Sequence, residues 1–243
     1  DRDRDRVKPR HDLLKNHMSG LNQSTVGDDE CAAFIQRHFP AAKCAWDMLR
    51  GHGAHRADLY RYVKLYVDGG IYLDIKTVPT QQLKDVFQLR WDDKLTWYAT
   101  YTTQMPGGPG PGRIYQGILV SPPRNPHLLE AIHLAVERAP EIASGRVGYM
   151  QGIADLTDYL REQYGGALRP GRNENANSRL ILLEEKCSRW WRSWGTGEEC
   201  NDQFFQDAGH GDRYNLCCNQ YAPWASSAPV IHTRDLDYPW VEC

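Results

Sequence analysis

The segment from His55 to Thr77, HRADLYRYVKLYVDGGIYLDIKT, constrains the fold more than any other part of this chain. Four residues in its first half recur at helical spacing: Leu59, Tyr62, Val63 and Tyr66. The Gly69-Gly70 pair then predicts the end of the helix, because glycine adopts a left-handed backbone at little cost. An apolar run over 71–73 predicts a short strand that ends at Asp74. We therefore expect a helix, a tight turn and a strand in direct succession.

Asp74 is the first candidate functional residue, because a carboxylate at the mouth of a buried strand is costly without a cation or a hydrogen-bond donor. Asp58 and Arg61, three residues apart, share one face of the predicted helix. Taken alone, this pair can equally be a surface ion pair that contributes about 0.2–0.5 kcal/mol, and Asp74 can be a turn residue. Their positions on either side of the Gly69-Gly70 pair favour one shared site.

Helices and strands alternate along the rest of the chain. Apolar periodicity with capping and terminating residues predicts helices over 28–39, 41–49, 126–136 and 153–164. Apolar or alternating runs predict strands over 95–101, 114–120 and 180–183. The glycine- and proline-rich segment 104–113 predicts a mobile loop, and the tail after 183 has no regular period. This order of elements predicts an α/β domain.

The composition narrows the classes of function. With 29 basic and 31 acidic residues, the net charge of −2 gives no case for binding nucleic acid or an anionic membrane. No apolar run approaches the roughly 18 residues of a membrane-spanning helix. The opening DRDRDRVKPRHD predicts a flexible segment over 1–27. It contains neither an initiating Met nor a signal peptide, so we expect the natural protein to extend upstream.

Seven cysteines allow two interpretations, disulfides in an oxidising compartment or buried reduced thiols. They lie at Cys31, Cys44, Cys187, Cys200, Cys217, Cys218 and Cys243. The crowding from Cys187 onward favours a disulfide-stapled, irregular cover rich in Cys and Trp, with Cys31–Cys44 as a second candidate bridge. The absence of a CxxC pair argues against a zinc ribbon.

The central segment resembles glycosyltransferases with a DXD-containing sugar-binding region, glycosyltransferase family 32. This group includes fungal initiating mannosyltransferases and is related to clostridial glucosylating toxins. The similarity lies in the order and spacing of Arg56-Ala57-Asp58-Leu59-Tyr60-Arg61-Tyr62, Leu65-Tyr66 and Gly69-Gly70-Ile71-Tyr72-Leu73-Asp74. Weaker similarity covers Asp28-Asp29-Glu30 and the strand from Ile114 to Pro123, where the family's usual Asn is Gln116.

The resemblance implies a GT-A-like, Rossmann-like mixed sheet flanked by helices. It places a partial catalytic domain over 28–185 and a C-terminal extension over 186–243 that completes the same domain. It also implies transfer of a hexose from a UDP- or GDP-sugar to a glycan or glycoconjugate acceptor, with retention at the anomeric carbon. The implied donor-binding residues are Arg56, Asp58, Arg61, Gly69, Gly70, Tyr72 and Asp74.

The chain departs from the family at the second Asp of the DXD motif, because the motif is Asp74-Ile75-Lys76. A protonated lysine cannot bind Mg²⁺ or Mn²⁺, which prefer oxygen ligands. Three alternatives follow. Lys76 can stabilise the diphosphate as a point charge, with Asp74 as the other catalytic residue. A metal can be held by Asp74, phosphate oxygens and a C-terminal ligand such as His232. The protein can also be a non-catalytic relative.

Two further expectations follow from the resemblance. Family members begin with a nucleotide-gripping strand that is absent before Asp28, which again predicts a longer natural protein. Such enzymes work in the secretory pathway, so we expect the Golgi lumen, with a membrane reached only through an upstream anchor. The alternative function is an inactive glycosyltransferase-like subunit with a structural or carbohydrate-binding role in a larger assembly.

Overall fold

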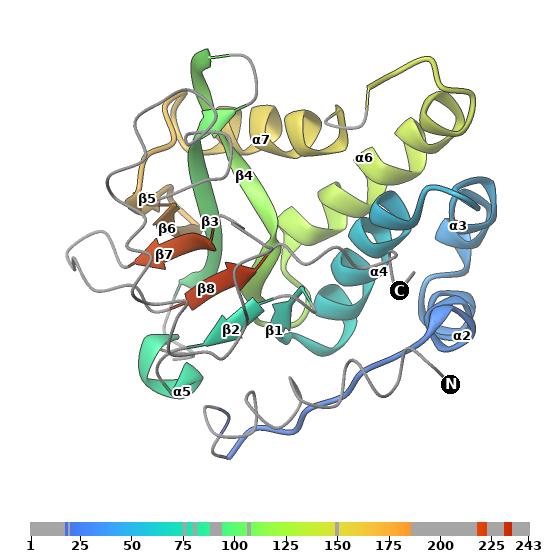
Figure 1. Cartoon of the computed structure of the whole chain (residues 1–243), viewed down its shortest axis with the longest axis horizontal. Helices are drawn as coiled ribbons and strands as arrows, with labels where there is room; N and C mark the ends of the chain where they lie inside the picture. Colours follow the sequence, from blue (N-terminus) through green and yellow to red (C-terminus); the bar gives the residue numbers. More distant parts are fainter. Residues whose placement is uncertain are drawn as a thin grey trace, which may run out of the picture.

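The computed structural model describes residues 18, 20–74, 77–79, 82–87, 94–105, 108–148, 151–185, 218–222 and 231–234. The helical elements are α2 (Asp28–His38), η1 (Pro40–Ala42), α3 (Lys43–Met48), α4 (Gly53–Asp68), α5 (Leu83–Val86), α6 (Pro126–Ala143) and α7 (Gln151–Gln163). The strands are β1 (Gly70–Leu73), β2 (Thr77–Pro79), β3 (Leu95–Met105), β4 (Gly108–Ser121), β5 (Gly171–Glu174), β6 (Ser178–Glu185), β7 (Cys218–Ala222) and β8 (Ile231–Arg234). Figure 1 shows these elements as one mixed sheet with helices beside it.

The strands of the described residues form one sheet in the order β1-β4-β3-β6-β7-β8-β2, and β5 pairs with β6. The β3–β6 pair is parallel, whereas the β1–β4, β3–β4 and β5–β6 pairs are antiparallel. The short strands β7, β8 and β2 extend the sheet through further antiparallel pairs. The predicted α/β class, a mixed sheet with flanking helices, is therefore confirmed.

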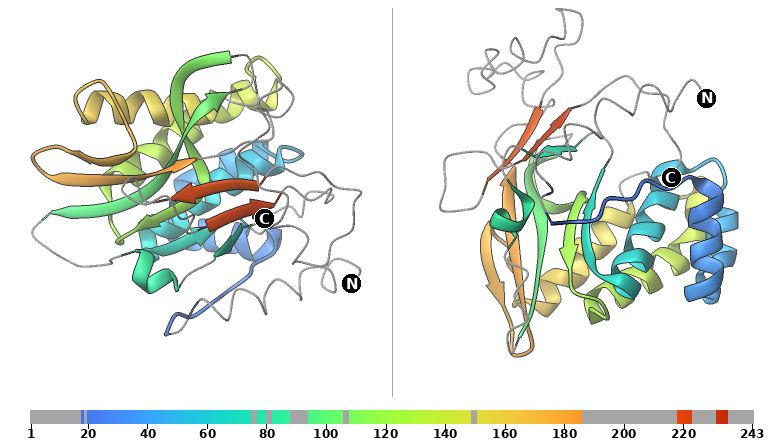
Figure 2. Two further views of the ribbon diagram at one scale, coloured as in Figure 1. Left: turned by 60° about the vertical axis from the view of Figure 1, so that its left-hand side comes forward. Right: turned by 90° about the horizontal axis from the view of Figure 1, so that it is seen from below.

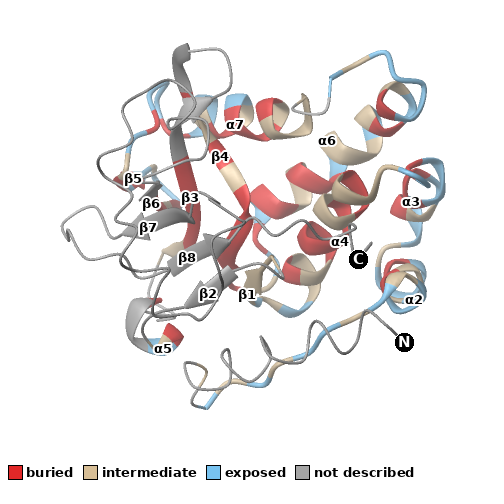
Figure 3. Ribbon diagram, in the orientation of Figure 1, coloured by how far each residue is buried: buried red, intermediate tan, exposed pale blue. Residues whose placement is uncertain are grey.

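The long helices cover one face of this sheet. In the view from below, α4, α6 and α7 lie together on one side of the strands (Figure 2). Side chains alternate along β3: Trp97 and Ala99 face the helices in the main core, while Tyr98 faces a second core with Leu83 and Phe87. Figure 3 shows the buried residues concentrated on β3, β4 and α4. The main core thus fixes α4 against the sheet.

The Gly69-Gly70 pair ends α4 as predicted. Gly69 has φ +69°, and a Cβ there would lie 2.6 Å from Cδ of Pro123. Gly70 has φ +107° and pairs with Ser121 at the start of β1. Because both positions need a backbone that side chains disfavour, and Gly69 also needs the close approach to Pro123, glycine at these positions sets the angle between α4 and β1.

A buried polar network joins α6 and α7 to the sheet. The Asn125 side chain accepts a hydrogen bond from His127 N at 2.9 Å and caps α6. The His127 ring then contacts Ser178 Oγ of β6 at 2.9 Å and the Tyr159 hydroxyl of α7 at 3.0 Å. Trp97 Nε1 of β3 donates to the nearby Tyr164 hydroxyl at 3.0 Å. Every group is satisfied inside the core, so the network is structural.

The prediction of a mobile loop over 104–113 is wrong for those residues of the segment that the structure describes. β3 and β4 continue through this region as a hairpin, with Gln104 opposite Pro109 and Met105 opposite Gly108. Glycine and proline exclude a helix here, but an extended backbone accommodates the fixed φ of proline. Pairing with β3 therefore decided the conformation.

Two further expectations are corrected. The tail after 183, which has no regular period in its sequence, contains the strands β7 and β8, because pairing to an existing sheet does not require apolar alternation. No disulfide joins Cys31 and Cys44: Cys31 is buried in α2 and Cys44 is exposed on α3. The other cysteine side chains lie outside the described residues. None of the described helices has the length and apolar character to cross a membrane.

Candidate functional site

α4 and β1 bring three charged side chains together around Arg61. Nη1 of Arg61 lies 3.2 Å from Oδ1 of Asp58, one turn away on the same helix, and Nη2 lies 3.4 Å from Oδ1 of Asp74. Only 6% of the Arg61 side chain is exposed. Its guanidinium also stacks 4.6 Å from the ring centroid of Tyr72. A buried cation therefore bridges two carboxylates from separate elements.

Asp74 is held in place by both neighbouring strands. The Tyr72 hydroxyl donates to its Oδ1 at 3.0 Å, and the Tyr115 hydroxyl of β4 donates to its Oδ2 at 3.2 Å. Its backbone N–H donates to the Gly117 carbonyl at 2.8 Å, which continues the β1–β4 pairing by one residue. These contacts leave the carboxylate aimed toward Arg61.

Asp58 is fixed on its other side by β4. In the orientation that satisfies both of its ends, the Gln116 amide donates to Oδ1 of Asp58 at 2.8 Å and accepts from the Tyr62 hydroxyl at 2.8 Å. Burial raises the pKa of Asp58 to about 6, and the negative charge of Asp74 adds to this, while Arg61 acts in the opposite direction. Burial also raises the pKa of Tyr62, so its hydroxyl stays a neutral donor.

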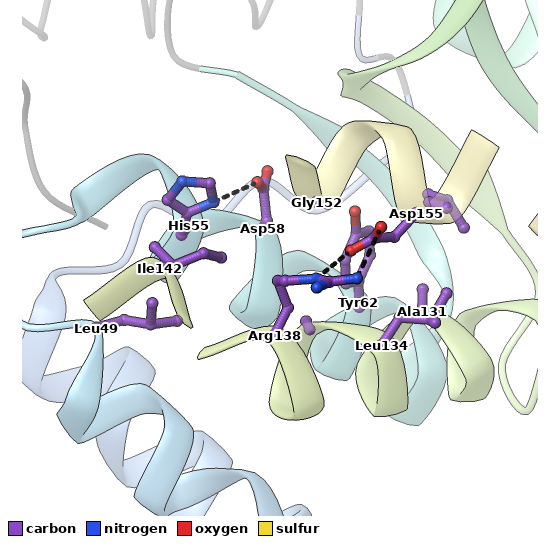
Figure 4. A pocket seen from close by; sticks show the side chains of 12 residues that line it. Leu49, His55, Asp58, Tyr62, Ala131, Leu134, Arg138, Ile142, Gly152 and Asp155 are labelled. Carbon is purple, nitrogen blue, oxygen red and sulfur yellow. Dashed lines mark hydrogen bonds and ion pairs between the residues drawn. The ribbon is translucent and has the colours of Figure 1, made fainter. Parts of the chain in front are cut away.

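A pocket opens beside Asp58 between α4, α6 and α7 (Figure 4). Its empty volume, counting the open mouth, is about 370 Å³. His55 forms one wall, with Nδ1 3.8 Å from Oδ2 of Asp58, and an Arg138–Asp155 ion pair at 2.7 Å forms another. Burial and the nearby His52 lower the pKa of His55, so this ring is neutral at neutral pH. The pocket therefore presents uncharged or internally paired groups around the Asp58 carboxylate.

The structure brings together four of the predicted site residues: Asp58, Arg61, Tyr72 and Asp74. It does not bring Arg56 to them. The Arg56 guanidinium pairs with Asp28 of α2 and lies 4.1 Å from the ring centroid of Trp46 in α3. Gly69 and Gly70 shape the turn between α4 and β1 through their backbone.

The two remaining predicted site residues, Lys76 and His232, come after Asp74 in the sequence. Lys76 lies outside the described residues, as does the His232 side chain. The β2–β8 pairing places the His232 backbone opposite Val78, two positions after Lys76 in the sequence. The backbone topology thus directs β8 to the segment that follows Asp74.

Sequence reasoning did not assign Tyr115 and Gly117 to the site. A Cβ on Gly117 would lie 2.6 Å from Oδ2 of Asp74 and would also overlap the Tyr115 hydroxyl. An isolated glycine within an apolar strand indicates a bulge or the close approach of another group to the backbone. Gly117 was therefore the signal in the sequence that could have identified this part of the site. The Tyr115 and Gln116 contacts are tertiary and carry no such signal.

The described residues do not by themselves fit a divalent metal ion. They contain no group of three His, Cys, Asp or Glu side chains placed to hold one. Asp74 is the one carboxylate of the Asp74-Ile75-Lys76 motif, and both of its oxygens already accept hydrogen bonds from tyrosines. A hard divalent ion prefers several oxygen ligands, so the described part of this site lacks the donor set.

Residues 15–96 match the family model described as glycosyltransferase sugar-binding region containing DXD motif. No curated protein matches the chain. The matched residues include α2, α3, α4 and β1, and with them Asp58, Arg61 and Asp74. β4, α6 and α7, which complete the site and its pocket, follow the matched region in sequence. Residues 15–96 are therefore similar to the glycosyltransferase sugar-binding region that contains a DXD motif.

Proposed function

We propose that the protein is a GT-A-like glycosyltransferase that moves a hexose from a UDP- or GDP-sugar to a glycan or glycoconjugate, with retention at the anomeric carbon. The observation that supports this most strongly is the buried Arg61 bridge between Asp58 and Asp74. It lies inside the segment that matches the sugar-binding family. We further propose the Golgi lumen as the compartment.

The three charged groups suit the recognition of sugar hydroxyls. A hydroxyl can donate to a carboxylate and accept from a guanidinium, and hydrogen bonds to ionised groups are stronger than those between neutral groups. Asp58 and Asp74 offer acceptors, and Arg61 lies between them as the donor. Burial reduces competition from water, which strengthens each contact and orients the donor hexose.

Lys76 supplies the remaining chemistry of the proposed reaction. As the bond between the anomeric carbon and the diphosphate breaks, negative charge accumulates on the leaving group, and a fixed cation stabilises it. Lys76 lies two residues after Asp74, where the family's second carboxylate would be. The proposed transfer therefore depends on Lys76, and Asp74 positions the donor. A metal held through Asp74 and His232 is the alternative that the chelation experiment below distinguishes.

Calorimetric titration and product detection with four donors test the proposal: UDP-glucose, UDP-galactose, UDP-N-acetylglucosamine and GDP-mannose. We expect one of these donors to bind and to be consumed in the presence of glycan acceptors. Asp74→Asn should reduce turnover at least about 100-fold, because Asp74 lies in the charged cluster. Asp158→Asn is the matched control, since this exposed carboxylate pairs only with Arg161 among the contacts described for it. Full activity of Asp74→Asn would refute the assignment.

The second candidate function is a non-catalytic carbohydrate-binding subunit. The observation that favours it is the lysine at position 76, where the family has its second carboxylate. Under this alternative the folded protein binds none of the four nucleotide sugars but is retained on a glycan array. Donor binding that Asp74→Asn weakens would exclude this alternative.

A further inference from the structure

The strand β4 carries an irregularity next to the site. Its register against β3 moves from Ala99 opposite Leu119 to Thr100 opposite Tyr115, so that 116–118 have no partner in β3. Thr100 Oγ1 donates to the Tyr115 carbonyl at 2.9 Å at the end of this bulge. On the other edge of β4, Leu73 still pairs with Ile118 and Asp74 N–H with the Gly117 carbonyl. A bulge of this kind redirects side chains, and bulges are frequent beside active sites.

Two successive side chains beside the bulge contact different carboxylates. The Tyr115 hydroxyl reaches Asp74, whereas the next residue, Gln116, points to α4 and reaches Asp58 and Tyr62. Gln116 is only 2% exposed. A buried primary amide is costly unless both of its ends are paired, and here the two ends are satisfied by Asp58 and Tyr62. These two contacts therefore fix the position of the Gln116 side chain.

On these contacts, we propose that Gln116 is a positioning residue of the donor-sugar site, which holds the Asp58 carboxylate in its binding orientation through the bulge in β4. This inference rests on the proposed function, but its structural part does not require a donor. Gln116 donates to the same Oδ1 that Arg61 contacts, at 2.8 Å and 3.2 Å. The Gln116 amide nitrogen also lies 3.3 Å from Oδ2 of Asp58, whose distance to Nδ1 of His55 is 3.8 Å. The amide therefore spans both carboxylate oxygens and fixes the orientation of the carboxylate beside the pocket.

Gln116 also keeps Asp58 charged. A buried carboxylate becomes neutral unless donors compensate its lost hydration, and a neutral Asp58 would weaken its pairing with Arg61. The groups that face Asp58 are His55, Arg61 and Tyr62 on α4, Asp74 after β1, and Arg138 and Asp155 across the pocket. Among these, Arg138 is committed to Asp155 and Glu141, so Arg61 and Gln116 are the close compensating donors in this part of the chain.

Replacing Gln116 by leucine tests the inference without any donor. The variant keeps a similar side-chain volume but loses the amide. The ionisation of Asp58 is followed through its carboxyl carbon NMR signal during a pH titration, and the Asp58→Asn variant identifies that signal. Since a hydrogen bond to a charged group is lost, the apparent pKa of Asp58 should rise by about 1 to 2 units. Tyr164→Phe is the control, because it removes buried hydrogen bonds from the remote His127 network. It should leave the Asp58 titration unchanged.

Folded Gln116→Leu protein with an unshifted Asp58 would overturn the inference. If this variant does not fold, Gln116→Glu gives the second test: a carboxyl so close to Oδ1 of Asp58 should share a proton with it and produce two coupled titrations. Independent titration of the two groups would also overturn the inference. With a donor that wild-type protein consumes, Gln116→Leu should lose turnover at neutral pH and regain part of it at higher pH, as Asp58 ionises. If the wild-type protein consumes none of the donors, this result contradicts only the proposed function, because the titration of Asp58 requires no donor.

Discussion

Arg61 in the middle of α4 and Asp74 at the end of β1 approach to 3.4 Å between Nη2 and Oδ1. The Gly69-Gly70 turn lets the chain reverse closely enough for this contact. Arg61 also contacts Asp58, so one planar guanidinium connects two elements. Lysine carries a single compact ammonium and does not reproduce this geometry.

We therefore expect Arg61→Lys to reduce donor affinity at least about tenfold while the fold is retained. The ammonium can approach Asp58 or Asp74 but not both with the planar geometry of arginine. Calorimetric titration with the donor that wild-type protein consumes measures the loss. Arg146→Lys, at an exposed position after α6 whose guanidinium contacts Ser144, is the matched control. Equal affinities of the two variants would contradict the bridging role.

Gly117→Ala should weaken the site through Asp74. The added Cβ would lie 2.6 Å from Oδ2 of Asp74 and would overlap the Tyr115 hydroxyl, so both groups must move. We expect a fall in turnover of about tenfold or more, because displacements of this size at a binding group are costly. Gly148→Ala is the control, since nothing lies within 4 Å of its Cβ. Unchanged turnover of Gly117→Ala would show that the position of Asp74 is not critical.

Acid should destabilise the fold through His127. Burial lowers the pKa of this ring to about 4 in the folded protein, below the ordinary 6.5 expected when unfolded. Below pH 6.5 the unfolded state binds more protons, so stability is full above that pH and falls as the pH drops toward 4. Between pH 7.5 and 4.5 the contribution of His127 to the free energy of unfolding should decrease by about 2–3 kcal/mol.

Urea unfolding at the two pH values measures this effect. His127→Gln should be less stable than the wild type at pH 7.5, because it loses part of the network, but its stability should change less with pH. His133→Gln removes an exposed histidine of the same helix and should keep the wild-type pH dependence. A His127→Gln variant with the full wild-type slope would assign the acid sensitivity to other groups.

Removal of divalent metal should leave transfer unchanged if Lys76 stabilises the leaving diphosphate. We expect equal turnover with and without EDTA, and a large loss in Lys76→Ala. Lys76→Asp restores the family's second carboxylate and should make any remaining activity dependent on Mn²⁺. Loss of wild-type activity in EDTA, with recovery on adding Mn²⁺, would instead support a metal held through Asp74.

Much of the local structure around the site was predictable from the sequence. The helix 53–68, its glycine stop and the strand that leads to Asp74 follow from apolar periodicity and from the backbone freedom of glycine. The helices starting at Asp28 and Pro126 follow from their capping residues. These signals depend on neighbours within a few residues, so they are legible without tertiary structure.

The segment 104–113 shows where local signals failed. Its glycines and prolines predict a loop, yet pairing between β3 and β4 makes it part of a hairpin. Arg56 shows the same limit for a side chain. It shares the matched segment with Asp58, but its direction on α4 takes it to Asp28 and Trp46. Sequence spacing places a residue on a helix and leaves open which neighbour will meet it.

The sequence by itself determined the α/β class, the order of the main helices, and the presence of Asp58, Arg61 and Asp74 around one glycine turn. Only the tertiary structure decided how these groups are held. The bulge in β4 places Tyr115 against Asp74 and Gln116 against Asp58, and Gly117 leaves the space both need. The physical reason is that register and close packing arise between segments far apart in the chain, whereas periodicity and capping record only neighbours.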